Sequence, residues 1–211
     1  MPKYLDIRSI SSSDLNTDFF PFFSTEKSLL KDVDSMAINS DFPDLKEGGS
    51  FPLEALEAGV SIEELVKELE GEELKRILEN KFDIDLQNKI AVTTLRGYSR
   101  ERDGKIHTDS KTKIVTVLLY LNLEWSEKNA HLRLLKDDSS LENYIQEIPC
   151  TFGSMVAFKV TDNCWHGFLP FEGKRLSVQL NYIQPNALNL HNFRHKTSSL
   201  LKRFKTKIMG Y

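Results

Sequence analysis

The sequence of 211 residues contains little cysteine and no long apolar run. Its two cysteines, Cys150 and Cys164, are too few for a disulfide framework, which favours a reducing, cytoplasmic setting. No stretch approaches the roughly 18 apolar residues of a membrane-spanning helix. The N-terminal segment also lacks the apolar centre of a signal peptide. These absences argue against disulfide-rich secreted proteins and integral membrane proteins, and a membrane partner is not expected.

Acidic residues are missing after Glu172, although the chain as a whole carries a net charge of -3. The segment that follows ends in a basic tail, whose cations are Arg194, Lys196, Lys202, Arg203, Lys205 and Lys207. A docked amphipathic helix is the simpler interpretation of this tail, and contact with phosphate or a membrane surface is the alternative. The small overall charge gives no reason to expect a nucleic-acid partner.

The hydrophobic pattern changes from helical to extended about two fifths of the way along the chain. Apolar residues recur at helical spacing from Ser61 to Phe82, and Gly71 is expected to divide this stretch into two helices. Five β-rich runs separated by polar turns follow: "KIAVTTLRGY", "KIVTVLLYLNLEW", "AHLRLL", "SMVAFKV" and "RLSVQLNYI". The pattern predicts a single mainly β domain of the α+β class, in which the strands form a β-sandwich or a jelly roll, and we expect the jelly roll. Its expected parts are an N-terminal extension with supporting helices (1–88), the jelly-roll core (89–184) and the basic tail or helix (185–211).

Three side chains in the β-rich part form a candidate metal site. His107 and Asp109 lie two residues apart, so they project from the same face if the chain is extended there. His166 follows a turn just before the last strand and offers a third donor. Two histidines and one carboxylate on one face of an octahedron form the facial triad of non-haem Fe(II) oxygenases. Because three positions remain open, O2 and a second molecule can both reach such a metal.

Arg175, nine residues after His166, adds an anion-binding group at the start of a strand. Its guanidinium can hold a carboxylate through two parallel hydrogen bonds. A dicarboxylate could therefore bind the metal with its 2-oxo acid end and Arg175 with the other end.

These residues stand within a longer pattern that resembles the 2-oxoglutarate- and Fe(II)-dependent dioxygenases, in particular their prolyl-hydroxylase-like branch. The resemblance covers about Ala91 to Ile183. "TVLLYLNLEW" is similar to the family's "T-x-x-x-Y-L-N-x-x-W" strand, and "FGSMVAF" is similar to the strand before the distal histidine. "HGFLPFEGKRLSVQLNYI" resembles the family's segment from that histidine to the carboxylate-binding arginine.

The resemblance implies a set of roles and a reaction. His107, Asp109 and His166 would bind Fe(II), and Arg175 would bind the distal carboxylate of 2-oxoglutarate. The same pocket would include Tyr120, Tyr98 and, as a weaker candidate, Gln179. The enzyme would hydroxylate an unactivated C–H bond with O2, releasing succinate and CO2, and ascorbate is a candidate reductant. The alternative is a non-oxidative protein: a cupin-like jelly roll that binds another metal, or a 2-oxoglutarate sensor.

The substrate cannot be read from the sequence. A small molecule and a protein side chain such as prolyl both remain open, and so do the oligomeric state and the roles of the two terminal regions. Arg96 and Arg100 could bind an acidic substrate, although exposed surface is the simpler interpretation. Ala130 and His131 stand where the family commonly has two glycines, so the sequence leaves open whether His131 takes part in the site.

Overall fold

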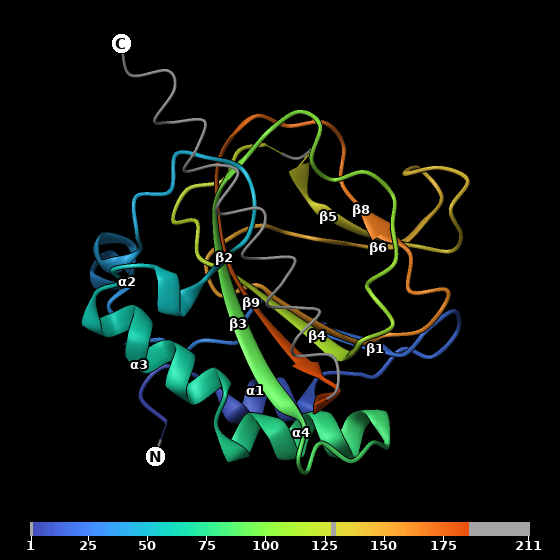
Figure 1. Ribbon diagram of the computed structural model, residues 1–211, viewed down its shortest axis with the longest axis horizontal. Helices are drawn as coiled ribbons and strands as arrows, with labels where there is room; N and C mark the ends of the chain where they lie inside the picture. The colour runs from blue at the N-terminus through green and yellow to red at the C-terminus, as the bar shows by residue number, and fades with distance from the viewer. Residues whose placement is uncertain (1, 128–129, 186–211) are drawn as a thin grey trace.

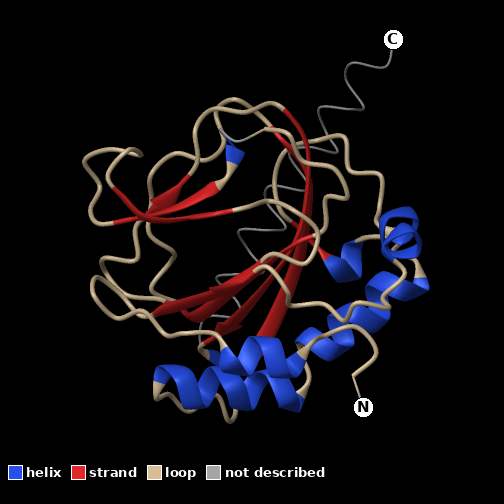
Figure 2. Ribbon diagram, turned by 180° about the vertical axis from the view of Figure 1, so that it is seen from behind, coloured by secondary structure: helices blue, strands red, loops and turns tan. Residues whose placement is uncertain are grey.

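The computed structural model describes residues 2–127 and 130–185 and consists of four helices and two antiparallel sheets in these ranges (Figures 1 and 2). The helices are α1 (Ile7–Ser12), α2 (Ser35–Asp41), α3 (Val60–Leu69) and α4 (Glu72–Phe82), with a short 3-10 turn at Leu53–Ala55. The six-stranded sheet has the order β1-β7-β4-β9-β3-β2, and the three-stranded sheet has the order β6-β5-β8. The predicted α+β, mainly β fold is confirmed.

The strands of the large sheet are β1 (Phe22–Thr25), β2 (Phe51–Pro52), β3 (Ile90–Ser99), β4 (Lys113–Tyr120), β7 (Met155–Lys159) and β9 (Gly173–Ile183). Those of the small sheet are β5 (Leu132–Leu135), β6 (Tyr144–Ile148) and β8 (His166–Gly167). All five predicted strands are present. The short strands β1, β2, β6 and β8 were not predicted, because two to five residues carry too little alternation to be recognised.

Helices α1, α3 and α4 run beneath one face of the large sheet, while the small sheet stands over its other face (Figure 2). Apolar residues of α3 and α4 recur at helical spacing and pack with the sheet in one core. The helix-facing residues of β4 and β9 in that core are Val115, Val117, Leu119, Leu176, Val178, Leu180 and Tyr182. A second, smaller core fills the space between the sheets and includes Phe22, Tyr120, Leu132, Leu134, Phe158 and Phe168. The site described below borders this inner space.

The division of the helical stretch at Gly71 is confirmed, since α3 ends at Leu69 and α4 begins at Glu72. The predicted C-terminal helix lies outside the described residues. Among the described helices, none is long and apolar enough to cross a membrane.

Candidate metal centre

The two histidines lie directly opposite each other on neighbouring backbone segments. His107 N–H donates to His166 O at 3.1 Å, and His166 N–H donates to His107 O at 3.0 Å. Residues paired in this antiparallel manner project to the same side. The two imidazole rings are accordingly close, with centroids 4.3 Å apart. The pairing of the two backbone segments thus brings together His107 and His166, which are 59 positions apart in the sequence.

A backbone carbonyl fixes the orientation of each imidazole. Lys105 O lies 2.7 Å from His107 Nδ1, and Cys164 O lies 2.8 Å from His166 Nδ1. Because a carbonyl can only accept, both Nδ1 atoms carry the proton, and each Nε2 presents its lone pair to a metal. Burial, followed by the nearby His107, lowers the pKa of His166 to about 4. His166 is therefore neutral at physiological pH, as a ligand must be.

Asp109 is held by two neighbours on the strand that follows it. Lys113 Nζ donates to Asp109 Oδ1 at 2.8 Å, and the Thr116 hydroxyl donates to Oδ2. Burial disfavours the charged carboxylate, but Lys113 and His166 outweigh it, so that the pKa of Asp109 lies below its usual value. The side chain is therefore an anion at neutral pH. Thr116 is itself within 3.0 Å of Asn181 Oδ1 on β9, which ties this ligand to the centre of the large sheet.

The three predicted ligands converge. His107, Asp109 and His166 each offer one ligand atom, and these atoms all lie within 4.8 Å of one another. His107 is exposed, Asp109 is half-buried and His166 is buried, so the cluster lies at the edge of the inner core with one open side. Two neutral imidazoles and one carboxylate form the donor set that suits non-haem Fe(II). The residues present therefore fit such a metal.

Arg175 projects from β9 on the same inner face of the large sheet. Its side chain is buried and donates to the Tyr120 hydroxyl at 3.0 Å and to Ala130 O at 3.3 Å, while the Phe168 ring covers the guanidinium at 4.1 Å. The arginine ion pairs of the described residues are those of Arg100 and Arg133, so Arg175 has no carboxylate partner there. A buried cation without a counter-ion is costly. Arg175 and Tyr120 thus form a cradle that suits one end of a carboxylate ligand such as 2-oxoglutarate.

Gln179 and Tyr98, the other predicted pocket residues, occupy different places. Gln179 is half-buried on the inner face of β9, four residues after Arg175, and its amide lies 3.1 Å from Asn181 Oδ1. Tyr98 does not join Arg175. The β3–β9 register shifts between Arg96 and Tyr98, so that Tyr98 pairs with Lys174 on the opposite face. Its hydroxyl lies 3.1 Å from Glu172 Oε1. The expected place of Tyr98 is therefore corrected: the β-bulge, which a strict two-residue alternation misses, turns it out of the pocket.

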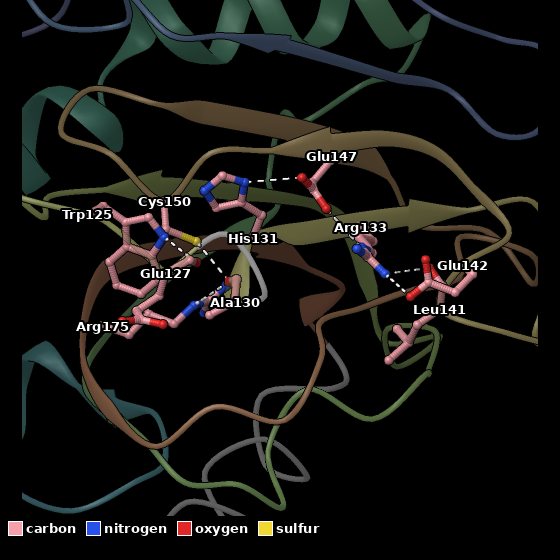
Figure 3. Close-up of polar contacts among 10 residues, drawn as sticks. All are labelled: Trp125, Glu127, Ala130, His131, Arg133, Leu141, Glu142, Glu147, Cys150 and Arg175. Carbon is pink, nitrogen blue, oxygen red and sulfur yellow. Dashed lines mark hydrogen bonds and ion pairs between the residues drawn. The ribbon is translucent and has the colours of Figure 1, made fainter.

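His131 points away from Arg175, as Figure 3 shows. Its Nδ1 lies 3.2 Å from Glu147 Oε1 on β6, and Arg133 Nε donates to Glu147 Oε2 at 2.9 Å. The neighbouring Ala130 contributes through its backbone only, since Ala130 O accepts from Arg175 and from the Cys150 thiol at 3.2 Å. The two residues at the glycine positions thus have different places. The backbone carbonyl of Ala130 accepts from Arg175, whereas the imidazole of His131 is directed toward Glu147.

Several contributors to the site were missed from the sequence. Lys113 and Thr116 hold Asp109, Phe168 covers Arg175, and Gly104 shapes the loop before His107. Thr116 could have been found from the sequence, because it lies two and four residues before Leu118 and Tyr120 and therefore shares their inner face of β4. Gly104 has a φ of 81°, and a Cβ there would lie 2.6 Å from the Phe168 ring. This close approach requires glycine.

Comparison with known proteins gives a family match over part of the chain and supports the fold. Residues 93–183 match the sequence profile described as the 2OG-Fe(II) oxygenase superfamily, whose members depend on Fe(II) and 2-oxoglutarate. Comparison with curated protein sequences gave no match.

Three solved structures are similar to this chain to different degrees, two of them with TM-scores above 0.5. A prolyl 4-hydroxylase of Phytophthora capsici is 15% identical, with a TM-score of 0.55, over 87% of this chain and 64% of that chain. HygX of Streptomyces hygroscopicus, with nickel and 2-oxoglutarate bound, is 12% identical, with a TM-score of 0.54, over 80% and 84%. A Pseudomonas putida prolyl-4-hydroxylase is 17% identical, with a TM-score of 0.48, over 60% and 64%. The chain thus spans less than two thirds of each of these two prolyl hydroxylases. The predicted jelly-roll fold is confirmed.

Proposed function

We propose that this chain, whose residues 93–183 match the profile of the 2OG-Fe(II) oxygenase superfamily, is a 2-oxoglutarate- and Fe(II)-dependent dioxygenase that hydroxylates an unactivated C–H bond. The substrate is a small metabolite or a protein side chain such as prolyl, and the co-products are succinate and CO2. Prolyl is included because a prolyl 4-hydroxylase of Phytophthora capsici has a similar fold.

One observation carries the proposal: the ligand atoms of His107, Asp109 and His166 lie within 4.8 Å of one another. Both Nδ1 atoms are occupied by backbone carbonyls, so both Nε2 atoms are available for one ion. The Asp109 carboxylate balances half of the charge of a divalent metal. Three protein ligands leave room for the oxo acid end of 2-oxoglutarate and for O2. When bound, Fe(II) and 2-oxoglutarate supply the oxidising chemistry that hydroxylation of a C–H bond needs.

The remaining residues would orient the co-substrate and exclude water. Arg175 would bind the distal carboxylate, and Tyr120, to which it already donates, would contact the same group. Aromatic rings enclose the site on its inner side, with Phe158 5.0 Å from the His166 ring and Phe168 4.1 Å from the Arg175 guanidinium. Because water is excluded on this side, the electrostatic interactions of Arg175 and Asp109 are strengthened.

The decisive experiment separates an oxygenase from a protein that only binds. Purified protein is incubated with Fe(II), 2-oxoglutarate, ascorbate and air, and succinate is measured by mass spectrometry. We expect slow succinate formation without added substrate and none with Asp109→Ala, while Asp138→Ala, an exposed carboxylate on the surface, behaves as the wild type. Binding of 2-oxoglutarate without succinate formation would indicate a sensor, and binding of neither iron nor 2-oxoglutarate would contradict the proposal.

A further inference from the structure

The inner face of the large sheet carries a second guanidinium, which the proposed chemistry does not use. Arg96 on β3 lies opposite Ser177 on β9, and Tyr120 on β4 lies opposite Ser177 from the other side. Ser177 and Arg175 are two residues apart and share this face. Since neighbouring strands are about 4.8 Å apart, the Cα atoms of Arg96 and Tyr120 are separated by about 10 Å. Arg96 and Arg175 therefore project from the same face of the sheet, and Arg175 is close enough to disfavour the charge of Arg96.

The charge of Arg96 has no counter-ion among the described residues. Its Nη2 donates to the Ser50 hydroxyl at 3.3 Å, and the arginine ion pairs there are those of Arg100 and Arg133. Asp103 exerts the largest favourable electrostatic effect on Arg96, but its carboxylate already accepts from Arg100 at 2.8 Å. Burial, followed by the nearby Arg175, lowers the pKa of Arg96, which means that its surroundings disfavour the cation.

The binding of 2-oxoglutarate as proposed above would leave this charge in place. A divalent metal is offset by Asp109 and by the metal-binding carboxylate of the co-substrate. The distal carboxylate offsets Arg175. Lys113, which pairs with Asp109, is a further cation at the site. The charge of the half-buried Arg96 therefore remains without a carboxylate of its own on this inner face. An additional monoanion would remove this cost, and a planar carboxylate fits a guanidinium through two parallel hydrogen bonds.

We propose that Arg96 binds a carboxylate of the primary substrate, so that this enzyme selects carboxylic acids over neutral compounds. The inference rests on the proposed function, because it places the acid beside bound 2-oxoglutarate. The carboxylate could belong to a free acid or to an acidic side chain within a peptide, and matched probes separate these two sources.

The test measures binding rather than turnover. Protein is loaded with Mn(II) as a stand-in for iron, and its affinity for 2-oxoglutarate is measured first by calorimetry. The protein saturated with 2-oxoglutarate is then titrated with N-acetyl amino acids and with their primary amides. A further arm uses N-acetyl-aspartic and N-acetyl-glutamic acid 1-amides, which keep only the side-chain carboxylate.

We expect at least one acid to bind wild-type protein tightly enough to be measured at millimolar concentration and more tightly than its amide. Arg96→Gln should weaken the binding of that acid by about tenfold to a hundredfold, the range for the loss of a charge-assisted hydrogen-bonded pair. The affinity for the amide should remain unchanged. The affinity of this variant for 2-oxoglutarate should change less than threefold, because in the proposal Arg96 does not contact 2-oxoglutarate directly. Arg96→Lys, which keeps the charge, should restore part of the preference for the acid.

Arg76→Gln is the matched control, because this exposed arginine of α4 undergoes the same change of charge away from the pocket. Two results would overturn the inference. One is a loss of 2-oxoglutarate affinity of more than about tenfold in Arg96→Gln, which would assign Arg96 to the co-substrate. The other is the absence of any acid that binds more tightly than its amide. If wild-type protein with Mn(II) fails to bind 2-oxoglutarate, the proposed function itself is wrong and the inference is lost with it.

Discussion

Replacement of Arg175 by methionine tests the anion cradle most directly. Arg175 as a whole is 3% exposed, and its guanidinium lies 4.1 Å from the Phe168 ring and donates to the Tyr120 hydroxyl at 3.0 Å. Methionine has a similar length and can keep the contact with Phe168 while removing the charge. Arg175→Met therefore separates the electrostatic role of this side chain from its role in packing.

The structure permits a rough magnitude. A hydrogen bond to a charged group contributes about 1.5–3 kcal/mol, and a bidentate pair with a carboxylate contains two of them. At the lower end the loss is about 3 kcal/mol, which corresponds to a roughly 150-fold weaker affinity for 2-oxoglutarate. The free energy of unfolding without ligand should fall by less than about 1 kcal/mol, and it can rise, because a buried unpaired cation is removed.

Calorimetry of 2-oxoglutarate binding to Mn(II)-loaded protein is the assay, and thermal unfolding without ligand gives the stability. Lys174→Met is the matched control, since Lys174 is the preceding residue of β9 and projects from the opposite face. The metal affinity should remain within about threefold of the wild type, because Arg175 is not among the ligands. Equal 2-oxoglutarate affinity in Arg175→Met and Lys174→Met would refute the carboxylate assignment.

Four further predictions concern the metal ligands and their supports. Asp109→Ala should abolish measurable Fe(II) or Mn(II) binding in a competition assay with a chelator, because it removes the only anionic ligand of the triad. Thr116→Val should weaken metal affinity by about tenfold to a hundredfold, since the carboxylate loses the hydroxyl that orients it, and an unchanged affinity would contradict this role. Gly104→Ala should lower the free energy of unfolding by about 1–3 kcal/mol in urea, because its φ is positive and the new Cβ meets the Phe168 ring. In metal-free protein the pKa of His166 is about 4 when folded and 6.5 when unfolded, so the unfolded chain takes up the proton first. Stability should therefore fall by about 3 kcal/mol as the pH decreases from about 6.5 to 4, and a His166→Gln variant should lack this slope.

The ligand triad could be predicted from the sequence because each member has a local signal. His107 and Asp109 are two residues apart before a strand, and His166 follows a turn before another. What no local pattern gives is the pairing of the segment that contains His107 with β8, which brings the imidazoles together. The long "KIVTVLLYLNLEW" and "RLSVQLNYI" runs were likewise recognisable as strands, since their apolar residues alternate over many positions.

The misplacement of Tyr98 has a specific physical cause. A β-strand alternates strictly only where its register with the neighbour is continuous, and the β3–β9 register shifts between Arg96 and Tyr98. At this shift Gly97 of β3 lies against two residues of β9, Arg175 and Leu176, so that Tyr98 comes to lie opposite Lys174. Gly97 lies at this point, where a Cβ would meet Leu45 at 2.6 Å, and an isolated glycine within a strand was the available signal.

The two faces of β9 show why the supporting helices and the site depend on each other. The inner face of this strand is polar at four successive positions, namely Arg175, Ser177, Gln179 and Asn181, while the outer face supplies Leu176, Val178, Leu180 and Tyr182 to the helix-covered core. A slip of one residue would place leucine and valine in the site and a guanidinium in the core. The apolar contacts of α3 and α4 therefore hold the register that aims Arg175 into the pocket. Changes in the core beneath β9 should affect co-substrate affinity through this register, although the helices pack on the opposite face of the sheet.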